Sequence, residues 1–160
     1  MTTTEQRRSL VLCADGTCNA FGHSHSNVAR LLECVDLDHV GTQVVCYDQG
    51  IGTTLKEHQR IKATLGGKAA LCLLRPPDEA WTRPRTWRSL VKSMTHGHGL
   101  KTNVGQLYEW LAKVYRPKDR LFLFGFSRGA FTVRALAGLM WRYGLPSTGE
   151  ATRAHAIFDE

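Results

Sequence analysis

The sequence lacks two features that would direct the chain to a membrane. It contains no apolar run as long as a membrane-spanning helix, and its first ten residues, MTTTEQRRSL, include no apolar stretch typical of a secretory signal. We therefore expect a cytoplasmic protein without a transmembrane segment. Export by a route that needs no such signal stays open.

Cysteine is too scarce for a disulfide framework. The five cysteines lie at positions 13, 18, 34, 46 and 72. Their odd number, and the apolar runs around several of them, favour reduced and buried thiols. Cys13 and Cys18 are not accompanied by a second ligand pair at the spacing of a zinc site, so we expect no metal.

The glycine-rich loops do not match nucleotide-binding motifs. Gly50-Ile51-Gly52 lacks the third glycine of a dinucleotide fingerprint, and Gly67-Lys68 is followed by alanine rather than by Ser or Thr. We therefore expect no cofactor.

Negative charge is in the minority: 21 Lys and Arg face 14 Asp and Glu, a net charge of +7. Such an excess fits contact with an anionic lipid surface, and it also fits a basic surface with no such partner. No nucleic-acid-binding motif accompanies the charge, so we expect no nucleic-acid partner. The oligomeric state is not indicated.

The chain is long and apolar enough for one folded domain over residues 1–160, at 42% hydrophobic and 22% charged residues. Three segments have the pattern of strands: Ser9–Ala14, Thr42–Tyr47 and Leu121–Phe124. The last of these is an apolar run typical of a parallel strand that helices cover on both faces. Helices are expected after a cap at Ser26 or Asn27, over Lys56–Leu65, around Val104–Val114, and from the turn after Phe124 to Tyr143 with Gly144 as its C-cap.

This alternation predicts an α/β fold with a parallel sheet flanked by helices, because strands joined by helical crossovers run parallel. If the first strand lies between the other two, the order of the three main strands is 2-1-3. The loops after the first and third strands then meet at the edge where such sheets bind ligands. Residues 66–98, with three of the five prolines, show no sustained periodicity and are interpreted as an insertion or loop over that edge.

The third strand leads into Gly125-Phe126-Ser127-Arg128-Gly129, a G-x-S-x-G followed at once by a helix of small residues. Strand, sharp turn and helix are the context in which this pattern forms a nucleophile elbow. Side chains two residues before and after the serine would clash in such a turn, which explains the two glycines. The sequence therefore predicts Ser127 as a catalytic nucleophile.

Two backbone groups are candidates for stabilising an oxyanion beside that serine. The N–H of Arg128 opens the helix, and the loop after the first strand, Asp15-Gly16-Thr17-Cys18-Asn19, supplies a second N–H from Gly16 or Thr17. Asp15 and Asn19 belong to this site loop, and we expect Asp15 to brace the loop rather than to carry protons.

A strand that ends in D-x-D-G-T would instead resemble the haloacid-dehalogenase phosphatases, which use the first aspartate as nucleophile. In this chain that position is Cys13. A buried thiol cannot act both as that nucleophile and as a magnesium ligand, which argues against phosphoryl transfer.

Several segments in the same order resemble an uncharacterised α/β-hydrolase domain family, which includes the catalytic domains of type VI secretion lipase (phospholipase) effectors. They are LVLCADGTCN at 10–19, SNVARL at 26–31, YDQGIGT at 47–53 and LFGFSRGAFTVRALAGL at 123–139. The resemblance implies an α/β-hydrolase fold, Ser127 as nucleophile, and esterase or phospholipase chemistry on an ester or lipid substrate.

The partners of a catalytic triad are not evident. In α/β-hydrolases the acid and the histidine follow the serine along the chain, and only Glu150, His155, Asp159 and Glu160 do so here. His23 and His25 would require a different order. We therefore interpret the chain as the N-terminal part of a longer serine hydrolase; the alternative is a non-catalytic α/β module that binds a partner or lipid.

Overall fold

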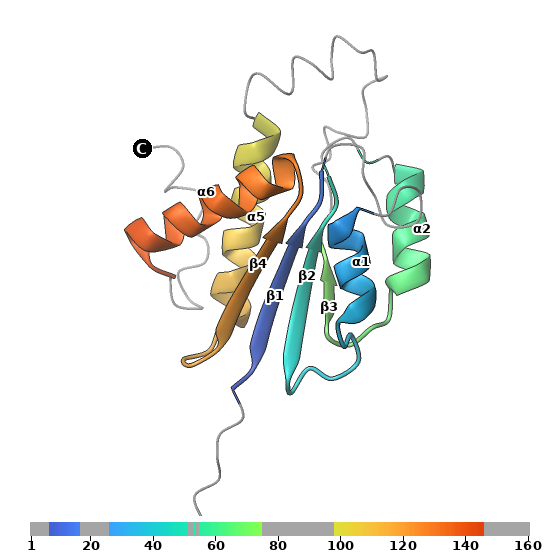
Figure 1. The fold of residues 1–160 in the computed structure, drawn as a ribbon, viewed down its shortest axis with the longest axis horizontal. Coiled ribbons are helices and arrows are strands. Elements are labelled where there is room, and N and C mark those ends of the chain that lie inside the picture. Colours follow the sequence, from blue (N-terminus) through green and yellow to red (C-terminus); the bar gives the residue numbers. More distant parts are fainter. Residues whose placement is uncertain (1–6, 17–25, 51–52, 54, 75–97, 146–160) are drawn as a thin grey trace, which may run out of the picture.

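The computed structural model describes residues 7–16, 26–50, 53, 55–74 and 98–145. Their centre is a parallel sheet of four strands: β1 (Ser9–Ala14), β2 (Gln43–Asp48), β3 (Leu71–Leu73) and β4 (Arg120–Gly125). The strands run in the order β3-β2-β1-β4, with all four carboxyl ends at the same edge of the sheet (Figure 1). The prediction of an α/β fold with a parallel sheet is confirmed.

The strand order differs from the predicted 2-1-3 because the sheet contains a strand that was not expected. β3 lies within residues 66–98, which the sequence suggested to be an insertion or loop, and it pairs with the outer side of β2. The three expected strands are β2, β1 and β4, and they are neighbours in that order. Residues 75–97 of the expected insertion lie outside the described residues.

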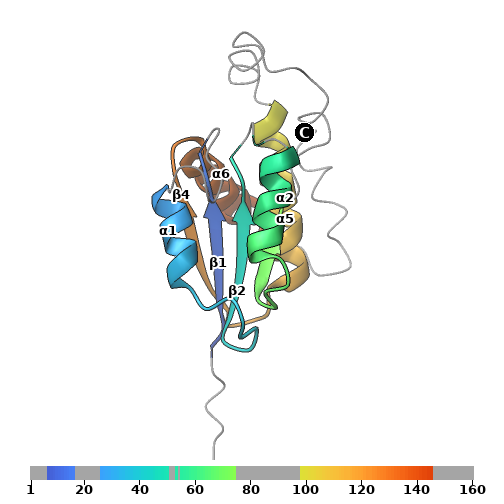
Figure 2. The same cartoon turned by 90° about the vertical axis from the view of Figure 1, so that its right-hand side faces the viewer.

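Helices cover the sheet on two sides. α1 (Asn27–Cys34) and α2 (Leu55–Leu65) contribute to the core on one face, whereas α5 (His98–Val114) and α6 (Arg128–Tyr143) contribute to the core on the other. Figure 2 shows α1 and α5 on opposite sides of β1 and β2. Successive strand residues point to opposite faces, so β1 supplies Leu10 and Leu12 to one core and Val11 and Cys13 to the other.

The helix ends follow the expected capping chemistry. Ser26 caps α1, because its hydroxyl accepts a hydrogen bond of 3.0 Å from the Ala29 N–H. Gly144 ends α6 at φ 73°, and its N–H donates to the Met140 carbonyl at 2.9 Å. A positive φ at this position favours glycine, as the sequence predicted.

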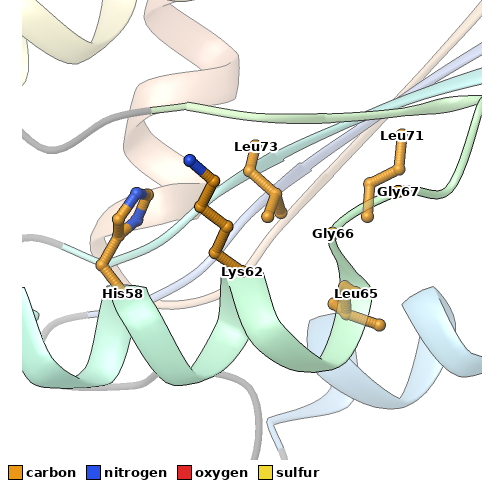
Figure 3. A pocket seen from close by; sticks show the side chains of 7 residues that line it. All are labelled: His58, Lys62, Leu65, Gly66, Gly67, Leu71 and Leu73. Carbon is orange, nitrogen blue, oxygen red and sulfur yellow. The ribbon is translucent and has the colours of Figure 1, made fainter.

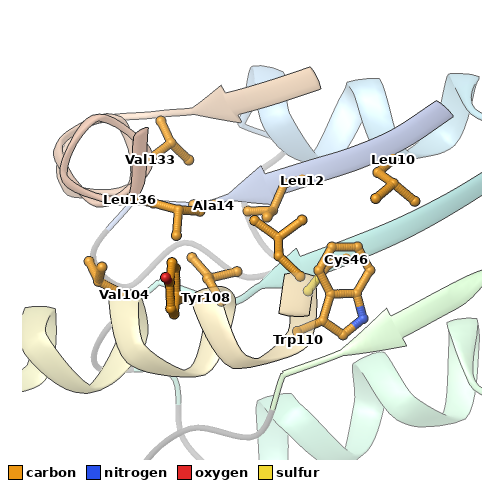
Figure 4. Close-up of a cluster of buried hydrophobic side chains, with 11 residues drawn as sticks. Leu10, Leu12, Ala14, Cys46, Val104, Tyr108, Trp110, Val133 and Leu136 are labelled. Atoms are coloured by element: carbon orange, nitrogen blue, oxygen red, sulfur yellow. The ribbon is translucent and has the colours of Figure 1, made fainter. Parts of the chain in front are cut away.

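The core between the sheet and the helices α5 and α6 is closely filled around two large side chains. Tyr108 and Trp110 of α5 pack there with Leu12 of β1 and Leu136 of α6, and Figure 4 shows this cluster. Tyr108, Leu12 and Leu136 are wholly buried. This core holds the start of α6 against the carboxyl ends of β1 and β4, where the predicted site lies.

β4 is less buried than its apolar sequence suggested. Phe122 and Phe124 are 40% and 39% exposed, and they alternate with partly buried leucines. Among the described residues, helices therefore cover one face of β4 and leave the other open, contrary to the prediction that helices cover both. No helix in the described part of the chain is long and apolar enough to cross a membrane.

Candidate functional site

Ser127 occupies the turn between β4 and α6 in a backbone conformation that is rare for serine. Its φ is 53° and its ψ is −117°, outside the regions that residues with a Cβ normally adopt. The residue is exposed, and its side chain does not cap the helix that follows it. The turn thus presents the hydroxyl to solvent at the carboxyl edge of the sheet.

The two glycines of G-x-S-x-G are required by close backbone approaches on either side of this turn. A Cβ on Gly125 would lie 2.5 Å from the carbonyl oxygen of Gly129. A Cβ on Gly129 would collide with the carbonyl oxygen of Ala14 and would lie 2.8 Å from that of Asp15. The obstacles are backbone atoms, which cannot move aside as a flexible side chain can, so glycine is needed at both positions.

The same approaches bring the end of β1 against the serine turn. Ala14 is the register partner of Gly125, and the Phe126 N–H donates to the Ala14 carbonyl at 3.1 Å. Asp15 follows directly, and its N–H donates to the Asp48 carbonyl of β2 at 2.9 Å. The loops after β1 and β4 therefore begin side by side, which is the arrangement that the sequence predicted.

Asp15 braces this edge of the sheet through three hydrogen bonds. Its Oδ1 accepts the Gly16 N–H at 2.8 Å, while its Oδ2 accepts the Ser26 hydroxyl at 2.8 Å and the Tyr47 hydroxyl at 2.9 Å. Asp15 is 3% exposed. One buried carboxylate thus connects the β1 loop, the N-cap of α1 and the end of β2.

The predicted oxyanion donors are only partly described. Arg128 is the first residue of α6, where N–H groups point out of the helix end. The Gly16 N–H is engaged by Asp15. Thr17 and Asn19 lie outside the described residues, as do the histidines and acids considered as triad partners, His23, His25, Glu150 and His155.

Asp48 is a buried acid at this edge that was not predicted as a site residue. Burial raises its pKa to about 7, and the neighbouring charge of Asp15 acts in the same direction. The Asn103 amide opposes the shift, since its Nδ2 donates to Asp48 Oδ2 at 2.9 Å. Asn103 lies 55 residues away on α5. An aspartate whose pKa is raised toward neutral pH is common at functional sites, although Asp48 is the last residue of β2 and not part of the serine turn.

A cavity of about 310 Å³ lies between α2 and β3, at the edge of the sheet away from β4 (Figure 3). Its lining includes His58, Lys62, Leu71 and Leu73, and none of the predicted site residues. Gln49, directly after β2, contacts the His58 ring of α2, and its side chain donates a hydrogen bond to the Leu74 carbonyl at 3.2 Å. These contacts connect the end of β2 to α2 and to the end of β3. β1 and β2 separate β3 from β4, and the cavity is therefore distinct from the serine turn.

The described residues contain no group of three His, Cys, Asp or Glu side chains placed to hold a metal ion. The histidine side chains that the structure describes are those of His39, before β2, and His58, on α2. Neither histidine lies on a segment adjacent to the turn that carries Ser127. An imidazole that serves this serine would therefore have to come from outside the described residues.

Comparison with known proteins identifies relatives of this chain. Residues 8–160 match the sequence model of the family described as "T6SS, Phospholipase effector Tle1-like, catalytic domain". The uncharacterized protein YEL023C of Saccharomyces cerevisiae is 31% identical over 143 residues, which are 89% of this chain. The chain spans only 18% of the length of that yeast protein. No solved structure was found to match. The chain therefore belongs to the family of T6SS phospholipase effector Tle1-like catalytic domains.

Proposed function

We propose that this chain carries the nucleophile of a serine hydrolase that cleaves carboxylic esters of lipids, with Ser127 as the attacking residue. The observation that carries the proposal is the backbone of Ser127, at φ 53° and ψ −117° between a strand and a helix. A strained conformation persists only where its surroundings hold it, and it is concentrated at functional sites. The glycine requirements at Gly125 and Gly129 are the local reason that the turn is held.

In the proposed reaction the Ser127 hydroxyl attacks the ester carbonyl while an imidazole accepts its proton. The negative charge that develops on the carbonyl oxygen is stabilised by the N–H of Arg128 and by the positive end of the α6 dipole. A second N–H comes from the β1 loop. Because Gly16 donates to Asp15 in this structure, Thr17 is the better candidate for that donor.

The acid and the imidazole of the triad are proposed to lie outside the described residues. In this interpretation residues 1–160 form the N-terminal part of a longer hydrolase domain. The length of the yeast relative, of which the chain spans 18%, is compatible with such a longer protein.

A lipid substrate is supported by the family and by the surface around the serine. The family description names a phospholipase effector. Phe126, next to the serine, is 43% exposed, and Phe131, one helical turn further along α6, is 61% exposed. Apolar side chains that stay in water beside a reacting group provide contacts for acyl chains. The net charge of +7 favours approach to an anionic lipid surface.

The proposal is tested by hydrolysis of phospholipid vesicles that contain an anionic lipid, using the full-length protein that carries this chain. We expect release of fatty acid, and a loss of at least about 10³-fold in kcat for Ser127→Ala, because the nucleophile is removed. Ser9→Ala, at the opposite end of the sheet, is the matched control. Equal turnover by Ser127→Ala and wild type would reject the proposal, and no turnover by either would favour a non-catalytic binding module.

A further inference from the structure

Cys46 and Cys72 form a pair of neighbouring thiols that the proposed hydrolysis does not use. Cys46 lies on β2 and Cys72 on β3, and the two residues are partners in the parallel register. Both belong to the core on the α5 and α6 side of the sheet, so their side chains point to the same face. The two thiols share a hydrogen bond, and neither forms a disulfide in this structure.

The two thiols differ in their surroundings. Cys46 is completely buried, and burial raises the pKa of its thiol well above the usual value. Cys72 is partly exposed, and the hydrogen bond from Cys46 lowers the pKa of Cys72 to about 7 against the opposing effect of partial burial. The thiol that is accessible is therefore also the thiol that ionises near neutral pH, and the buried thiol stabilises its charge.

The backbone spacing at this pair suits a covalent bond. Neighbouring strands of a sheet lie about 4.8 Å apart, and the Cα atoms of disulfide-bonded cysteines are usually about 4.4–6.8 Å apart. Because the side chains also share a face, a bond between the sulfurs requires no change of strand register.

We propose that Cys72 and Cys46 form an oxidation site, at which a hydroperoxide oxidises Cys72 and Cys46 then closes a disulfide between β3 and β2. Cys72 is the residue that the peroxide attacks first, and Cys46 is the resolving thiol. This modification site lies at the β3 edge of the sheet, whereas Ser127 follows β4 at the other edge, and the site does not depend on the proposed hydrolysis.

The chemistry proceeds in two balanced steps. The Cys72 thiolate attacks one peroxide oxygen, an S–O bond forms as the O–O bond breaks, and the departing hydroxide is protonated to water; sulfur loses two electrons and the peroxide gains them. The Cys46 sulfur then attacks the Cys72 sulfenic acid. The S–S bond forms, the S–O bond breaks, and the hydroxide leaves as water with the proton of Cys46. In total, two thiols and hydrogen peroxide yield one disulfide and two waters.

The bond would hold the outer edge of the sheet in place. β3 has three residues, and among the described strands it pairs with β2 alone. Leu71 and Leu73, on either side of Cys72, line the cavity between β3 and α2. A disulfide at Cys72 would therefore fix one wall of that cavity to the centre of the sheet.

The test is treatment of the full-length protein with hydrogen peroxide near pH 7, followed by alkylation of the remaining thiols, digestion and mass spectrometry. We expect a peptide that joins Cys46 to Cys72, formed about fivefold faster than oxidation of the exposed Cys34, because Cys72 ionises near pH 7 and has the Cys46 thiol beside it in the register. Reduction with dithiothreitol should restore alkylation at both cysteines. The proposal would be overturned if Cys46 and Cys72 could still be alkylated after a peroxide treatment that oxidises Cys34.

Two variants separate the roles of the pair. Cys46→Ala should leave a Cys72 sulfenic acid that dimedone traps, whereas Cys34→Ser should form the Cys46–Cys72 peptide at the wild-type rate. If Cys46→Ala does not fold, the wild-type peptide map decides alone. Accumulation of a dimedone adduct at Cys72 in the wild-type protein, without the joined peptide, would show that Cys46 does not resolve it and would overturn the proposal.

Discussion

Replacement of Asp48 by asparagine is expected to stabilise the protein at alkaline pH and much less at acidic pH. Asp48 is 6% exposed, and burial raises its pKa to about 7. Asparagine has nearly the same shape and cannot ionise. Its carbonyl oxygen can still accept the hydrogen bond that Asn103 Nδ2 now donates to Asp48 Oδ2 at 2.9 Å. The substitution therefore removes a buried charge and retains its main contact.

The sign and size follow from proton linkage. The pKa of an aspartate in an unfolded chain is about 3.9, so between that value and about 7 the unfolded state releases a proton that folded Asp48 retains. Stability consequently falls as pH rises through this window, and the penalty is complete above about pH 7. Well below about pH 3.9 the group is protonated in both states and contributes nothing. A difference of about three pKa units corresponds to about 4 kcal/mol, of which about 3 kcal/mol develops between pH 4.5 and pH 8.

Urea unfolding at pH 4.5 and pH 8, followed by circular dichroism, measures the effect. The increase in the free energy of unfolding that Asp48→Asn gives over wild type should be about 3 kcal/mol larger at pH 8 than at pH 4.5. Asp38→Asn removes an exposed carboxylate that pairs with Lys68, and it reports the effect of losing one negative charge from the surface. The reasoning would be refuted if the effect of Asp48→Asn on the free energy of unfolding differed by less than about 0.5 kcal/mol between the two pH values, or if the difference had the opposite sign.

Three further substitutions test contacts at the two ends of the sheet. Gly129→Ala places a methyl group against the Ala14 carbonyl and should lower the free energy of unfolding by more than about 3 kcal/mol, measured by urea unfolding; a loss under about 1 kcal/mol would show that the turn is not tightly held. Ser26→Ala removes the cap of α1 and a hydrogen bond to a buried carboxylate, and thermal unfolding should show a loss of about 1–2 kcal/mol; an unchanged Tm would contradict this. Asp119 forms a mostly buried ion pair with Arg8 at 2.6 Å, so Asp119→Ala should lower the free energy of unfolding by about 2–3 kcal/mol. Asp119→Asn is the milder control, and equal stability of the two variants would argue against the ion pair.

The strands and helices that position the serine were predictable because their signals are local. Ser9–Ala14 is a strand over the predicted residues, Ser26 is the cap of α1, and Gly144 ends α6. Each of these depends on hydrophobic pattern or on the chemistry of a single residue. The two glycines of the serine turn could also be explained in advance, since the strand–turn–helix context demands a close backbone approach.

The features that the sequence did not reveal depend on contacts between distant segments. β3 has three residues without a periodic pattern, and it is a strand because β2 offers it an edge. Phe122 and Phe124 belong to an apolar run whose exposure depends on where helices pack. Asp48 and Asn103 are separated by 55 residues, so their buried hydrogen bond has no local signal. Tertiary packing decided each of these cases, and local propensity did not.

The measurement that tests the central claim most directly is labelling of the full-length protein with a fluorophosphonate, followed by identification of the modified peptide. An activated serine forms a covalent adduct with this reagent, whereas an ordinary surface serine does not. We predict one adduct, on Ser127, which is absent from Ser127→Ala and retained in Ser9→Ala. A folded protein without an adduct on Ser127, or an adduct that persists in Ser127→Ala, would contradict the account.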